Sequence, residues 1–493
     1  MTETYVSRAL ELIAGYGDAE AVVSGERRTS HAELRQRVLD LAAALPDRGV
    51  PPGSALGVLT GNDVDAVVSH LAAHLLGCRT AYVAADSPPW YQMDFLRLAE
   101  VDAFLYDPAV ATLLPAVPLI PLDAPLPAGA KAIPTPGGEP QSILETGGTT
   151  ARPKLVHYRE PFYRSILALS AGYLAAGLPP LRHVTMSFFS HISGHVAALM
   201  TLLTGGVWLP QPDFVVDDLL RVIERERVTS IFLTPAQLYQ VLDHPRLAST
   251  DTSSLHTVSV GAGPTAPARL AQAVDVFGPV VRVTYGSTEA AFIAALPGIG
   301  ADPSTVDRLH SCGRPYGDMR VRIRDERGAV LPPGDTGEVW VSGGLTMAGY
   351  WGEPELTAQT IVDGWLRTGD LGYLDAEGYL FLVDRAKDLI ITGIRASKIY
   401  SRPVEDVLAA HPQVRAAAVI GVPDPALGEV VHAYVVPVPG AEVTAAELRQ
   451  RVVDAFDETW APRRVEFLDA LPLTDVGKVD KKALRAHYHG MGH

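Results

Sequence analysis

Short apolar segments alternate with alanine-rich amphipathic stretches along the first part of the chain. Residues 55–60 have the composition of a strand, and residues 64–76 have the pattern of a helix. This rhythm predicts an α/β sheet domain. Turns that follow strand ends are where such folds bind ligands. Further short apolar or β-branched segments, each feeding a glycine, proline or polar turn, lie at residues 184–189, 230–234, 257–260 and 281–285.

Beyond Asp318 the pattern of the sequence changes from alternating strands and helices to hairpin-like strands. Residues 320–325 and 337–342 have the character of hairpin strands, with a turn at 326–328, and predict a small β subdomain. After Asp388 a new alternation begins, which predicts a separate C-terminal domain of about a hundred residues. Its helix-like and strand-like stretches lie at residues 404–408, 416–422, 432–436 and 445–456.

Composition limits the classes of function. The 493 residues predict roughly two to four domains. A net charge of −15 argues against nucleic acid as a general partner, because neutralising phosphates requires a basic surface. Cys78 and Cys312 lie far apart without ligand-like spacing, which excludes a disulfide framework and a cysteine-based zinc site.

The sequence also predicts no membrane partner. The start of the chain lacks a basic segment followed by an apolar one, so it does not predict a signal peptide. The apolar stretch 196–209 is interrupted by threonines and glycines and is too short to span a bilayer. We therefore expect a soluble, cytoplasmic protein.

The segment from Thr146 to Lys154 has the composition of a phosphate-binding loop. It contains two glycines, three threonines and two cations in nine residues. Glycines let backbone N–H groups turn toward an anion, hydroxyls add donors, and the cations supply charge. The spacing of a Walker A loop is absent, so a different nucleotide-binding architecture is expected. A glycine- and threonine-rich surface turn is the alternative interpretation.

Six segments, in this order and spacing, resemble the adenylate-forming superfamily of acyl-CoA synthetases, nonribosomal-peptide adenylation domains and luciferase-like AMP-dependent ligases. The resemblance covers essentially the whole chain. The segments are the loop at 146–154, Tyr285-Gly-Ser-Thr-Glu289, residues 337–344 with Gly349-Tyr350-Trp351, Arg367-Thr-Gly-Asp370, Asp384 to Asp388, and the stretch 471–478 that ends in Gly477-Lys478.

The resemblance implies a fold and a reaction. A large N-terminal domain, residues 1–386, would contain two α/β sheet subdomains and the small β subdomain, followed by a small mobile α+β domain, residues 387–493. The reaction is attack of a carboxylate on the α-phosphate of ATP, with release of pyrophosphate. A thiol of CoA, or of phosphopantetheine on an acyl carrier protein, would then take the acyl group. The expected cofactors are ATP and Mg²⁺.

The resemblance also assigns ATP-binding residues. Tyr285 would stack on adenine, and Asp370 would accept hydrogen bonds from the ribose hydroxyls, since a carboxylate offers only acceptors. Thr288 would meet phosphate, Glu289 would coordinate magnesium, and Arg385 would donate to ribose or phosphate. The remaining nucleotide contacts would be Thr146, Gly148, Thr149, Thr150, Lys154 and Gly261.

Lys478 is the strongest catalytic candidate. In the family pattern this lysine bridges the substrate carboxylate and the α-phosphate, where its charge stabilises the transition state. The alternative is a solvated member of the basic run formed with Lys481, Lys482 and Arg485. Lys387 occupies the family's hinge position, about which the small domain rotates between the two half-reactions. Gly393 would lie on the strand that lines the thiol tunnel.

The residues that would select the acid are less clearly marked. The segment 188–194 resembles the one that ends in an aromatic and histidine gate beside the acyl pocket, with His191 as the pocket candidate. No aspartate occupies the position that pairs with an α-ammonium in amino-acid-activating members, which disfavours an α-amino acid. The other pocket candidates are Phe189, Gly194, Gly263 and Ser287.

Two regions depart from the family pattern. The phosphate loop has Gly147 where serine is usual, Ala151 where glycine is usual and Leu155 where another glycine is common. The hairpin after Gly393 is about two residues longer than usual, and its Arg395, together with Lys398 and Arg402, would either meet an acceptor phosphate or form a solvated basic turn. These departures leave two alternatives: an adenylating enzyme whose acceptor is an amine or an oxyanion such as nitrite, and a nucleotide-binding scaffold without turnover.

Overall fold

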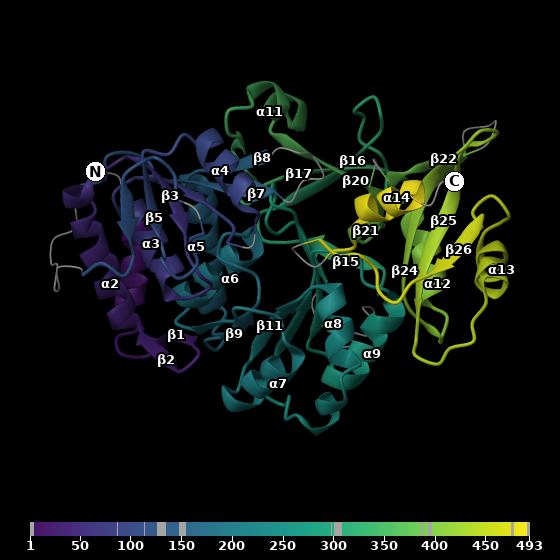
Figure 1. The fold of residues 1–493 in the computed structure, drawn as a ribbon, viewed down its shortest axis with the longest axis horizontal. Helices are drawn as coiled ribbons and strands as arrows, with labels where there is room; N and C mark the ends of the chain where they lie inside the picture. Colours follow the sequence, from purple (N-terminus) through teal and green to yellow (C-terminus); the bar gives the residue numbers. More distant parts are fainter. Residues whose placement is uncertain are drawn as a thin grey trace.

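The fold is a large mixed α/β body followed by a smaller unit at the C-terminal end (Figure 1). The structure is a computed structural model, and it describes residues 4–85, 87–112, 114–125, 135–146, 154–296, 298–299, 308–385, 388–392, 397–474 and 478–490. The arrangement confirms the predicted fold class. The helices are α1 (Tyr5–Gly15), α2 (His31–Ala44), α3 (Val64–Leu75), α4 (Pro89–Leu98), α5 (Glu160–Ala175), α6 (Ile192–Leu203), α7 (Val216–Arg225), α8 (Pro235–Leu242), α9 (Pro267–Phe277), α11 (Pro354–Thr360), α12 (Ser401–Ala409), α13 (Ala445–Ala455) and α14 (Lys481–Gly490).

The first sheet is parallel except at one edge. Strands β3 to β7 pair in parallel, whereas β8 returns antiparallel to β7 and then pairs with β18 from far along the chain. Its order is β18 (Gly349–Tyr350), β8 (Lys154–Tyr158), β7 (Gln141–Thr146), β4 (Arg79–Tyr82), β3 (Ala55–Leu59), β5 (Ala103–Tyr106) and β6 (Leu119–Pro121).

The second sheet joins a mainly parallel half, with one antiparallel edge strand, to an antiparallel half. The predicted small β subdomain is continuous with it, because β14 and β15 carry the ladder from β13 across to β21. The order is β16 (Arg320–Arg324), β17 (Gly337–Ser342), β20 (Trp365–Leu374), β21 (Leu380–Arg385), β15 (Ser311–Pro315), β14 (Ala294–Leu296), β13 (Val281–Tyr285), β12 (Thr257–Val260), β11 (Ser230–Leu233), β9 (Arg182–Thr185), β10 (Val207–Pro210), β1 (Glu20–Ser24) and β2 (Arg27–Ser30), with β19 (Ile361–Val362) beside β20.

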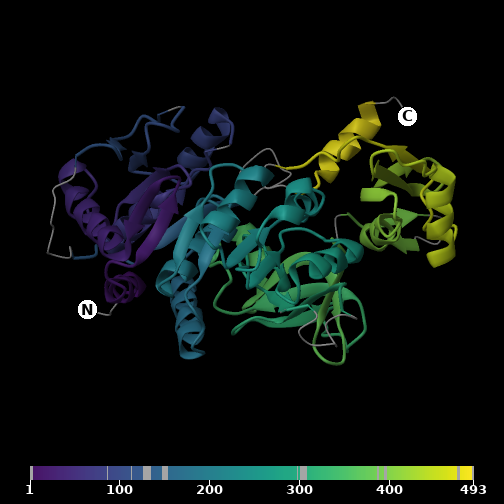
Figure 2. The same cartoon turned by 90° about the horizontal axis from the view of Figure 1, so that it is seen from below.

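The third sheet is formed only by strands that follow residue 388. It lies with α12, α13 and α14 to the right in Figure 1, and the view from below shows the same separation (Figure 2). We keep the division at residues 386 and 387 as a proposal, since both lie outside the described residues. The strands are β22 (Ile390–Thr392), β23 (Ser397–Ile399), β24 (Val414–Asp424), β25 (Gly428–Pro437) and β26 (Arg464–Phe467).

Local sequence explains where α8 begins. Thr234 follows the last residue of β11 and caps the helix, its hydroxyl accepting from the Gln237 N–H while the Gln237 side chain accepts from the Thr234 N–H. Pro235 occupies the first turn, where its missing N–H costs nothing. The capping box fixes the direction in which α8 leaves the sheet, toward Asp243 at its far end.

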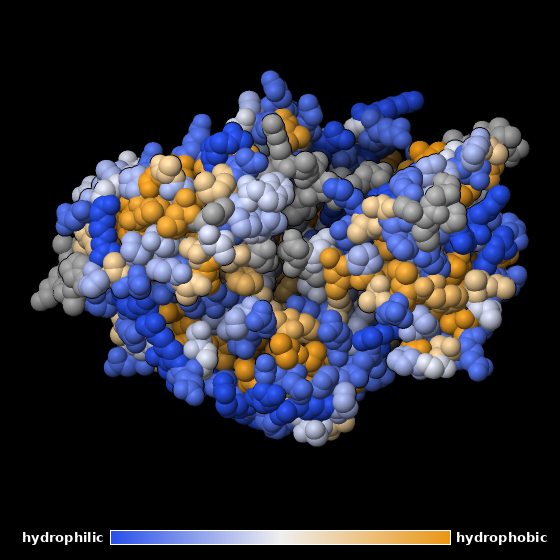
Figure 3. Space-filling view, in the orientation of Figure 1, coloured by the Kyte–Doolittle hydropathy of each residue, from blue (hydrophilic) through white to orange (hydrophobic). Residues whose placement is uncertain are grey.

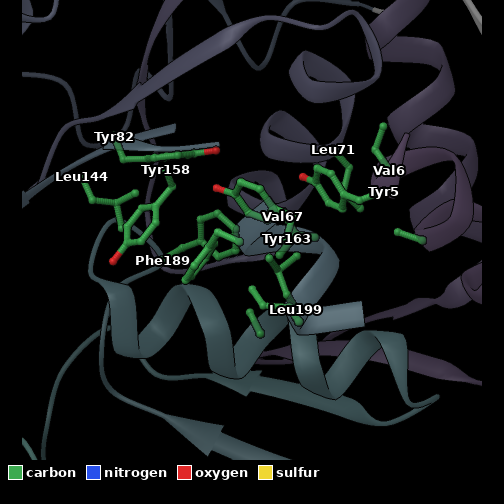
Figure 4. Close-up of a cluster of buried hydrophobic side chains, with 14 of the residues drawn as sticks. Tyr5, Val6, Val67, Leu71, Tyr82, Leu144, Tyr158, Tyr163, Phe189 and Leu199 are labelled. Carbon is green, nitrogen blue, oxygen red and sulfur yellow. The ribbon is translucent and has the colours of Figure 1, made fainter. Parts of the chain in front are cut away.

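The core that joins the two larger sheets contains buried aromatic residues among aliphatic ones (Figure 4). Three histidines, His70, His74 and His195, lie in it with 0% exposure. The Tyr5 hydroxyl lies 2.9 Å from His70 Nε2 and 2.5 Å from His74 Nδ1. His195 is hydrogen-bonded to the hydroxyl of Tyr163 at 3.3 Å. The imidazoles are therefore satisfied as neutral groups inside the protein.

The surface seen in Figure 3 shows hydrophobic groups scattered among hydrophilic ones, without a continuous apolar belt across that face. Of the helices that the described residues form, none combines the length and the apolar character needed to cross a bilayer.

The buried histidines predict a loss of stability in acid. Burial lowers the pKa of His74 and of His195 to about 3, whereas the unfolded chain titrates near the ordinary value of about 6.5. Between these values the unfolded state binds more protons, so stability falls as the pH drops below about 6.5. From pH 7.5 to 5.5 each residue should lower the free energy of unfolding by about 1.4 kcal/mol.

Urea unfolding followed by tryptophan fluorescence at several pH values measures this slope. Between pH 7.5 and 5.5 the His195→Gln variant should lose about half a proton, on average, from the slope of the free energy of unfolding against pH, whatever its stability at pH 7.5. Equal slopes in the two proteins would contradict the assignment of His195 as a buried neutral group.

Candidate active site

The carboxyl ends of β11, β12 and β13 lie at one edge of the second sheet, because these strands pair in parallel. The chain leaves β12 at Gly261, where an added Cβ would lie 2.4 Å from Thr284 Oγ1. Only glycine permits this approach to the neighbouring strand end. Ala262 follows with φ of +66°, a strained conformation for a residue with a side chain. The predicted nucleotide contact Gly261 is therefore held in a tightly constrained turn.

Three predicted ATP-binding residues meet beside this edge. Tyr285 ends β13, whereas Asp370 and Arg385 face each other across β20 and β21. The Tyr285 hydroxyl donates a 2.5 Å hydrogen bond to Asp370 Oδ2, and Arg385 Nε lies 3.1 Å from Asp370 Oδ1. Asp370 is 7% exposed, so these two donors stabilise a largely buried negative charge.

The protonation of this cluster is set by its own charges. Burial, and then the adjacent Asp370, raise the pKa of Tyr285 well above its ordinary value. Asp370 likewise raises the pKa of the Arg385 guanidinium. Both groups are therefore donors at neutral pH. Each carboxylate oxygen of Asp370 has a second lone pair, which leaves room to accept a hydroxyl from a ligand.

The turn that carries Thr288 and Glu289 is fastened from two sides. The Met347 N–H donates a 2.8 Å hydrogen bond to the Glu289 carbonyl, and the Tyr158 hydroxyl donates to the Thr288 carbonyl. The Tyr350 hydroxyl donates to Glu289 Oε1 at 3.0 Å. The backbone and the carboxylate of this turn are both held in place.

Tyr158 and Tyr350 were not predicted as site residues. Tyr350 belongs to one of the family motifs, Gly349-Tyr350-Trp351. The motif marks the residue, but the sequence does not predict its contact with Glu289. Tyr158 belongs to none of the six motifs, and nothing in the sequence marks it.

The phosphate-binding loop lies between two strands, β7 and β8, that pair antiparallel with each other. Thr146 ends β7, Lys154 begins β8, and the two residues pair across the hairpin. The predicted donors Gly148, Thr149 and Thr150 lie outside the described residues, as do the departures at positions 147 and 151. The two strands therefore define where the loop starts and ends, and the roles of the residues between them stay predictions.

The acid-pocket candidates lie in different surroundings. His191 precedes the first residue of α6, and a Cβ at Gly194 would lie 2.3 Å from the Phe188 carbonyl oxygen, so glycine is needed there. Phe189 is 1% exposed, and its ring centre lies 4.3 Å from that of His195 in the core. The Phe189 side chain thus packs into the core and anchors segment 188–194 there.

Gly263 and Ser287 lie in the turns after β12 and β13. The atoms nearest to a Cβ at Gly263 belong to Pro235, at 3.5 Å, which is ordinary contact. The Ser287 N–H donates a 2.8 Å hydrogen bond to the Ala290 carbonyl. Within segments 186–194, 261–266 and 286–293, all of which the structure describes, Glu289 is the only acidic residue and no lysine or arginine occurs.

Lys478 is hydrogen-bonded to Thr474 within the C-terminal unit. The Thr474 N–H donates to the Lys478 carbonyl at 2.7 Å, and the Lys478 N–H donates to the Thr474 hydroxyl at 3.2 Å. In Figure 1 the chain between β26 and α14 extends from the C-terminal unit toward the large body. The predicted hinge Lys387 and the predicted tunnel residue Gly393 lie outside the described residues.

Other members of the basic run near Lys478 have structural partners. Lys481 Nζ lies 2.8 Å from Glu405, and Arg485 lies 2.8 Å from Asp388. These two cations therefore stabilise the C-terminal unit itself.

Ion pairs and hydrogen bonds join the C-terminal unit to the large body. Asp243, at the end of α8, lies 2.7 Å from Arg269 through Oδ1 and 3.0 Å from Arg415 of β24 through Oδ2. Arg402 donates to the Leu382 carbonyl at 3.2 Å. Lys398, a candidate phosphate contact together with Arg402, lies 3.1 Å from Glu326. Both candidates thus contact the large body in this arrangement.

The side chains at the site suit Mg²⁺ together with a nucleotide better than an all-protein metal cage. Among the described residues, no three histidine, cysteine or acidic side chains cluster as a metal site. Glu289 supplies a hard carboxylate oxygen, and Mg²⁺ commonly takes one or two carboxylates and completes its shell with phosphates and water. Glu289 is the residue that would hold the ion.

The sequence matches two family descriptions, AMP-binding enzyme over residues 11–351 and AMP-binding enzyme C-terminal domain over residues 403–478. It is 33% identical to the medium/long-chain-fatty-acid–CoA ligase FadD8 of Mycobacterium tuberculosis, covering 94% of this chain and 86% of the relative. It is 34% identical to a feruloyl-CoA synthase of Amycolatopsis sp, covering 95% and 96%. The amide bond synthetase McbA from Marinactinospora thermotolerans is similar in structure, with a TM-score of 0.86, 36% identity, and coverage of 98% of this chain and 99% of that one.

The geometry predicts that Asp370 contributes strongly to ATP affinity. Asp370→Asn keeps the size of the side chain but removes the charge that pairs with Arg385. Hydrogen bonds to charged groups contribute about 1.5–3 kcal/mol, so ATP should bind about tenfold to a hundredfold more weakly. Isothermal titration calorimetry measures the change. Glu338→Gln, which removes a comparable ion pair with Arg367 in the same sheet, is the matched control; equal losses in the two variants would contradict a direct role.

Proposed function

Since this chain belongs to the AMP-binding enzyme family, we propose that it is an ATP-dependent ligase that converts a carboxylic acid into an acyl adenylate and then into a thioester. The observation that carries the proposal is the meeting of Tyr285, Asp370 and Arg385 at the strand edge that also carries Glu289. The sequence places these residues far apart, and an adenylating site needs them together.

The proposed reaction has two steps. In the first, a carboxylate oxygen of the acid attacks the α-phosphorus of ATP, the bond from that phosphorus to the bridging oxygen breaks, and pyrophosphate leaves with the electron pair. In the second, a thiolate sulfur attacks the acyl carbon and AMP leaves. The thiol proton is transferred to solvent or base before or during this attack.

Each predicted residue has a task in the first step. Asp370 would accept the ribose hydroxyls and Tyr285 would support the adenine, so that the α-phosphorus is held in one place. Lys154 and the rest of the phosphate-binding loop would bind the departing phosphates, where positive charge and N–H donors stabilise the leaving group. Lys478 would lie between the carboxylate and the α-phosphate, and its charge would offset the negative charge that gathers there.

We propose an acid without a second charge as the substrate. The pocket segments after β9, β12 and β13 contain no lysine or arginine that would pair with a second carboxylate. Their single acidic residue, Glu289, is hydrogen-bonded to Tyr350 and is the proposed magnesium ligand, so it is not the partner of an α-ammonium group. A buried charge without a partner is costly, so an uncharged aryl or acyl tail fits best. The acids in the names of the two CoA-ligase relatives, feruloyl and fatty, are of this kind.

An amine acceptor is the second candidate. The structural relative named as an amide bond synthetase is 36% identical to this chain along almost its whole length. The hairpin after Gly393, which is the predicted thiol-side surface, is also longer in sequence than the family pattern. Incubation with acid and ATP, with either CoA or a panel of amines, distinguishes thioester from amide by mass spectrometry.

Pyrophosphate release tests the adenylation step. With a panel of aryl and fatty acids, the wild-type protein should release pyrophosphate only when an acid is present. Lys478→Ala should lower the rate by about a hundredfold or more, because it removes a charge that acts mainly in the transition state. Lys482→Ala, at an exposed neighbouring lysine, is the control and should leave the rate unchanged. Release without any acid, or with none of the acids, would overturn the proposal.

The ion pair between Asp243 and Arg415 predicts a second effect on the rates. If the small domain rotates between the two steps, this pair holds only the present orientation. Arg415→Gln should lower the rate of pyrophosphate release by about 1.4-fold to fivefold, since a partly exposed ion pair contributes about 0.2–1 kcal/mol. Thioester formation from preformed acyl adenylate, followed in a stopped-flow instrument, should not slow. The matched control is Arg449→Gln, which removes an exposed ion pair within the small domain. A parallel loss in both steps would contradict this role.

A further inference from the structure

Tyr350 connects the proposed magnesium ligand to the strand that follows the phosphate-binding loop. Its hydroxyl donates a 3.0 Å hydrogen bond to Glu289 Oε1. Its backbone pairs with Val156 on β8, the strand that begins at Lys154. One side chain thus spans the two segments that the proposed function assigns to metal and phosphate.

Tyr350 is itself held rigidly. Its N–H donates a 2.9 Å hydrogen bond to Thr357 Oγ1 of α11, and the next N–H, that of Trp351, donates to the Leu155 carbonyl at 2.8 Å. The residue is 8% exposed. Gly349 precedes it with φ of +152°, and a Cβ there would lie 2.7 Å from the Thr357 side chain. The position of the phenol oxygen is therefore fixed by the backbone on both sides.

The phenol can act only as a donor toward Glu289. A carboxylate offers only acceptors, so the Tyr350 hydroxyl is the donor in this hydrogen bond. Lys154 Nζ lies 5.6 Å from the centre of the Tyr350 ring, within range of a cation–π contact. The hydroxyl occupies one carboxylate oxygen of Glu289, and no hydrogen bond or ion pair from a described residue uses the other, Oε2.

We propose that Tyr350 is a positioning residue that sets the magnesium affinity of this enzyme by fixing the rotamer of Glu289, with Oε2 left for the ion. The inference rests on the proposed function, in which Glu289 binds Mg²⁺. Without the phenol, the carboxylate is free to adopt other rotamers, and each added rotamer lowers the fraction of protein that is ready to bind the metal. The effect is therefore on the metal-dependent part of nucleotide binding and not on the nucleotide itself.

Titration calorimetry with ATP in the presence of Mg²⁺ and in the presence of EDTA separates these two parts. Tyr350→Phe keeps the ring, its packing and its contact with Lys154, and removes only the hydroxyl. We expect ATP affinity in EDTA to stay within twofold of wild type, and the half-saturating Mg²⁺ concentration to rise about fivefold to tenfold. Tyr373→Phe is the matched control, because Tyr373 stacks on Phe381 in the second sheet and makes no hydrogen bond to a carboxylate of the described residues.

A double-variant cycle shows whether Tyr350 acts through Glu289. Glu289→Gln should weaken the magnesium dependence, and adding Tyr350→Phe to it should produce no further change. The proposal is overturned if Tyr350→Phe leaves the magnesium dependence unchanged, if it weakens ATP equally with and without Mg²⁺, or if the two substitutions weaken magnesium binding additively. Failure of the proposed function is a different result, namely a wild-type protein whose ATP binding does not depend on Mg²⁺.

Discussion

The continuous hydrogen-bond ladder between the parallel and antiparallel halves of the second sheet is the constraint on which the site depends. The step from β13 through β14 and β15 to β21 brings Tyr285 and Asp370 into contact, although 85 positions separate them in the chain. Gly313, within β15, has φ of +86°, and a Cβ there would lie 1.8 Å from the Ala295 carbonyl oxygen. A side chain at that one position would force the two halves apart and with them the residues that meet between them.

The first sheet forms the other side of the site, because a segment far downstream in the chain pairs with it. β18 adds a short antiparallel strand to β8, so the hairpin that carries the phosphate-binding loop is joined to a segment far downstream. The same segment donates the Met347 N–H to the Glu289 carbonyl. Main-chain hydrogen bonds thus join the two sheets beside the proposed ATP site.

The sequence predicted those parts of the fold and site that depend on a local pattern of residues, such as the bounds of a strand or the residues of a motif. The strands β12, β13 and β17 have the predicted bounds, because each is a β-branched run ended by glycine or a polar residue. The resemblance drew attention to Asp370 and Arg385, and the structure brings them together.

The sequence did not predict where a side chain points or which distant residue it contacts. Phe189 follows another aromatic residue and gives no sign that its ring points into the core beside His195. The contact of Tyr158 with Thr288 joins positions 130 apart. The continuity of the small β region with the parallel sheet depends on pairing of this same long-range kind, which composition and periodicity do not encode.

The carboxylate of Asp243 is shared between an arginine of its own domain and one of the other. When Arg415 withdraws, Arg269 still neutralises the charge, so separating the two domains creates no orphaned anion and carries little electrostatic penalty. A junction built in this way favours one arrangement without trapping the protein in it. The proposed rotation of the small domain would make and break this contact once in each catalytic cycle.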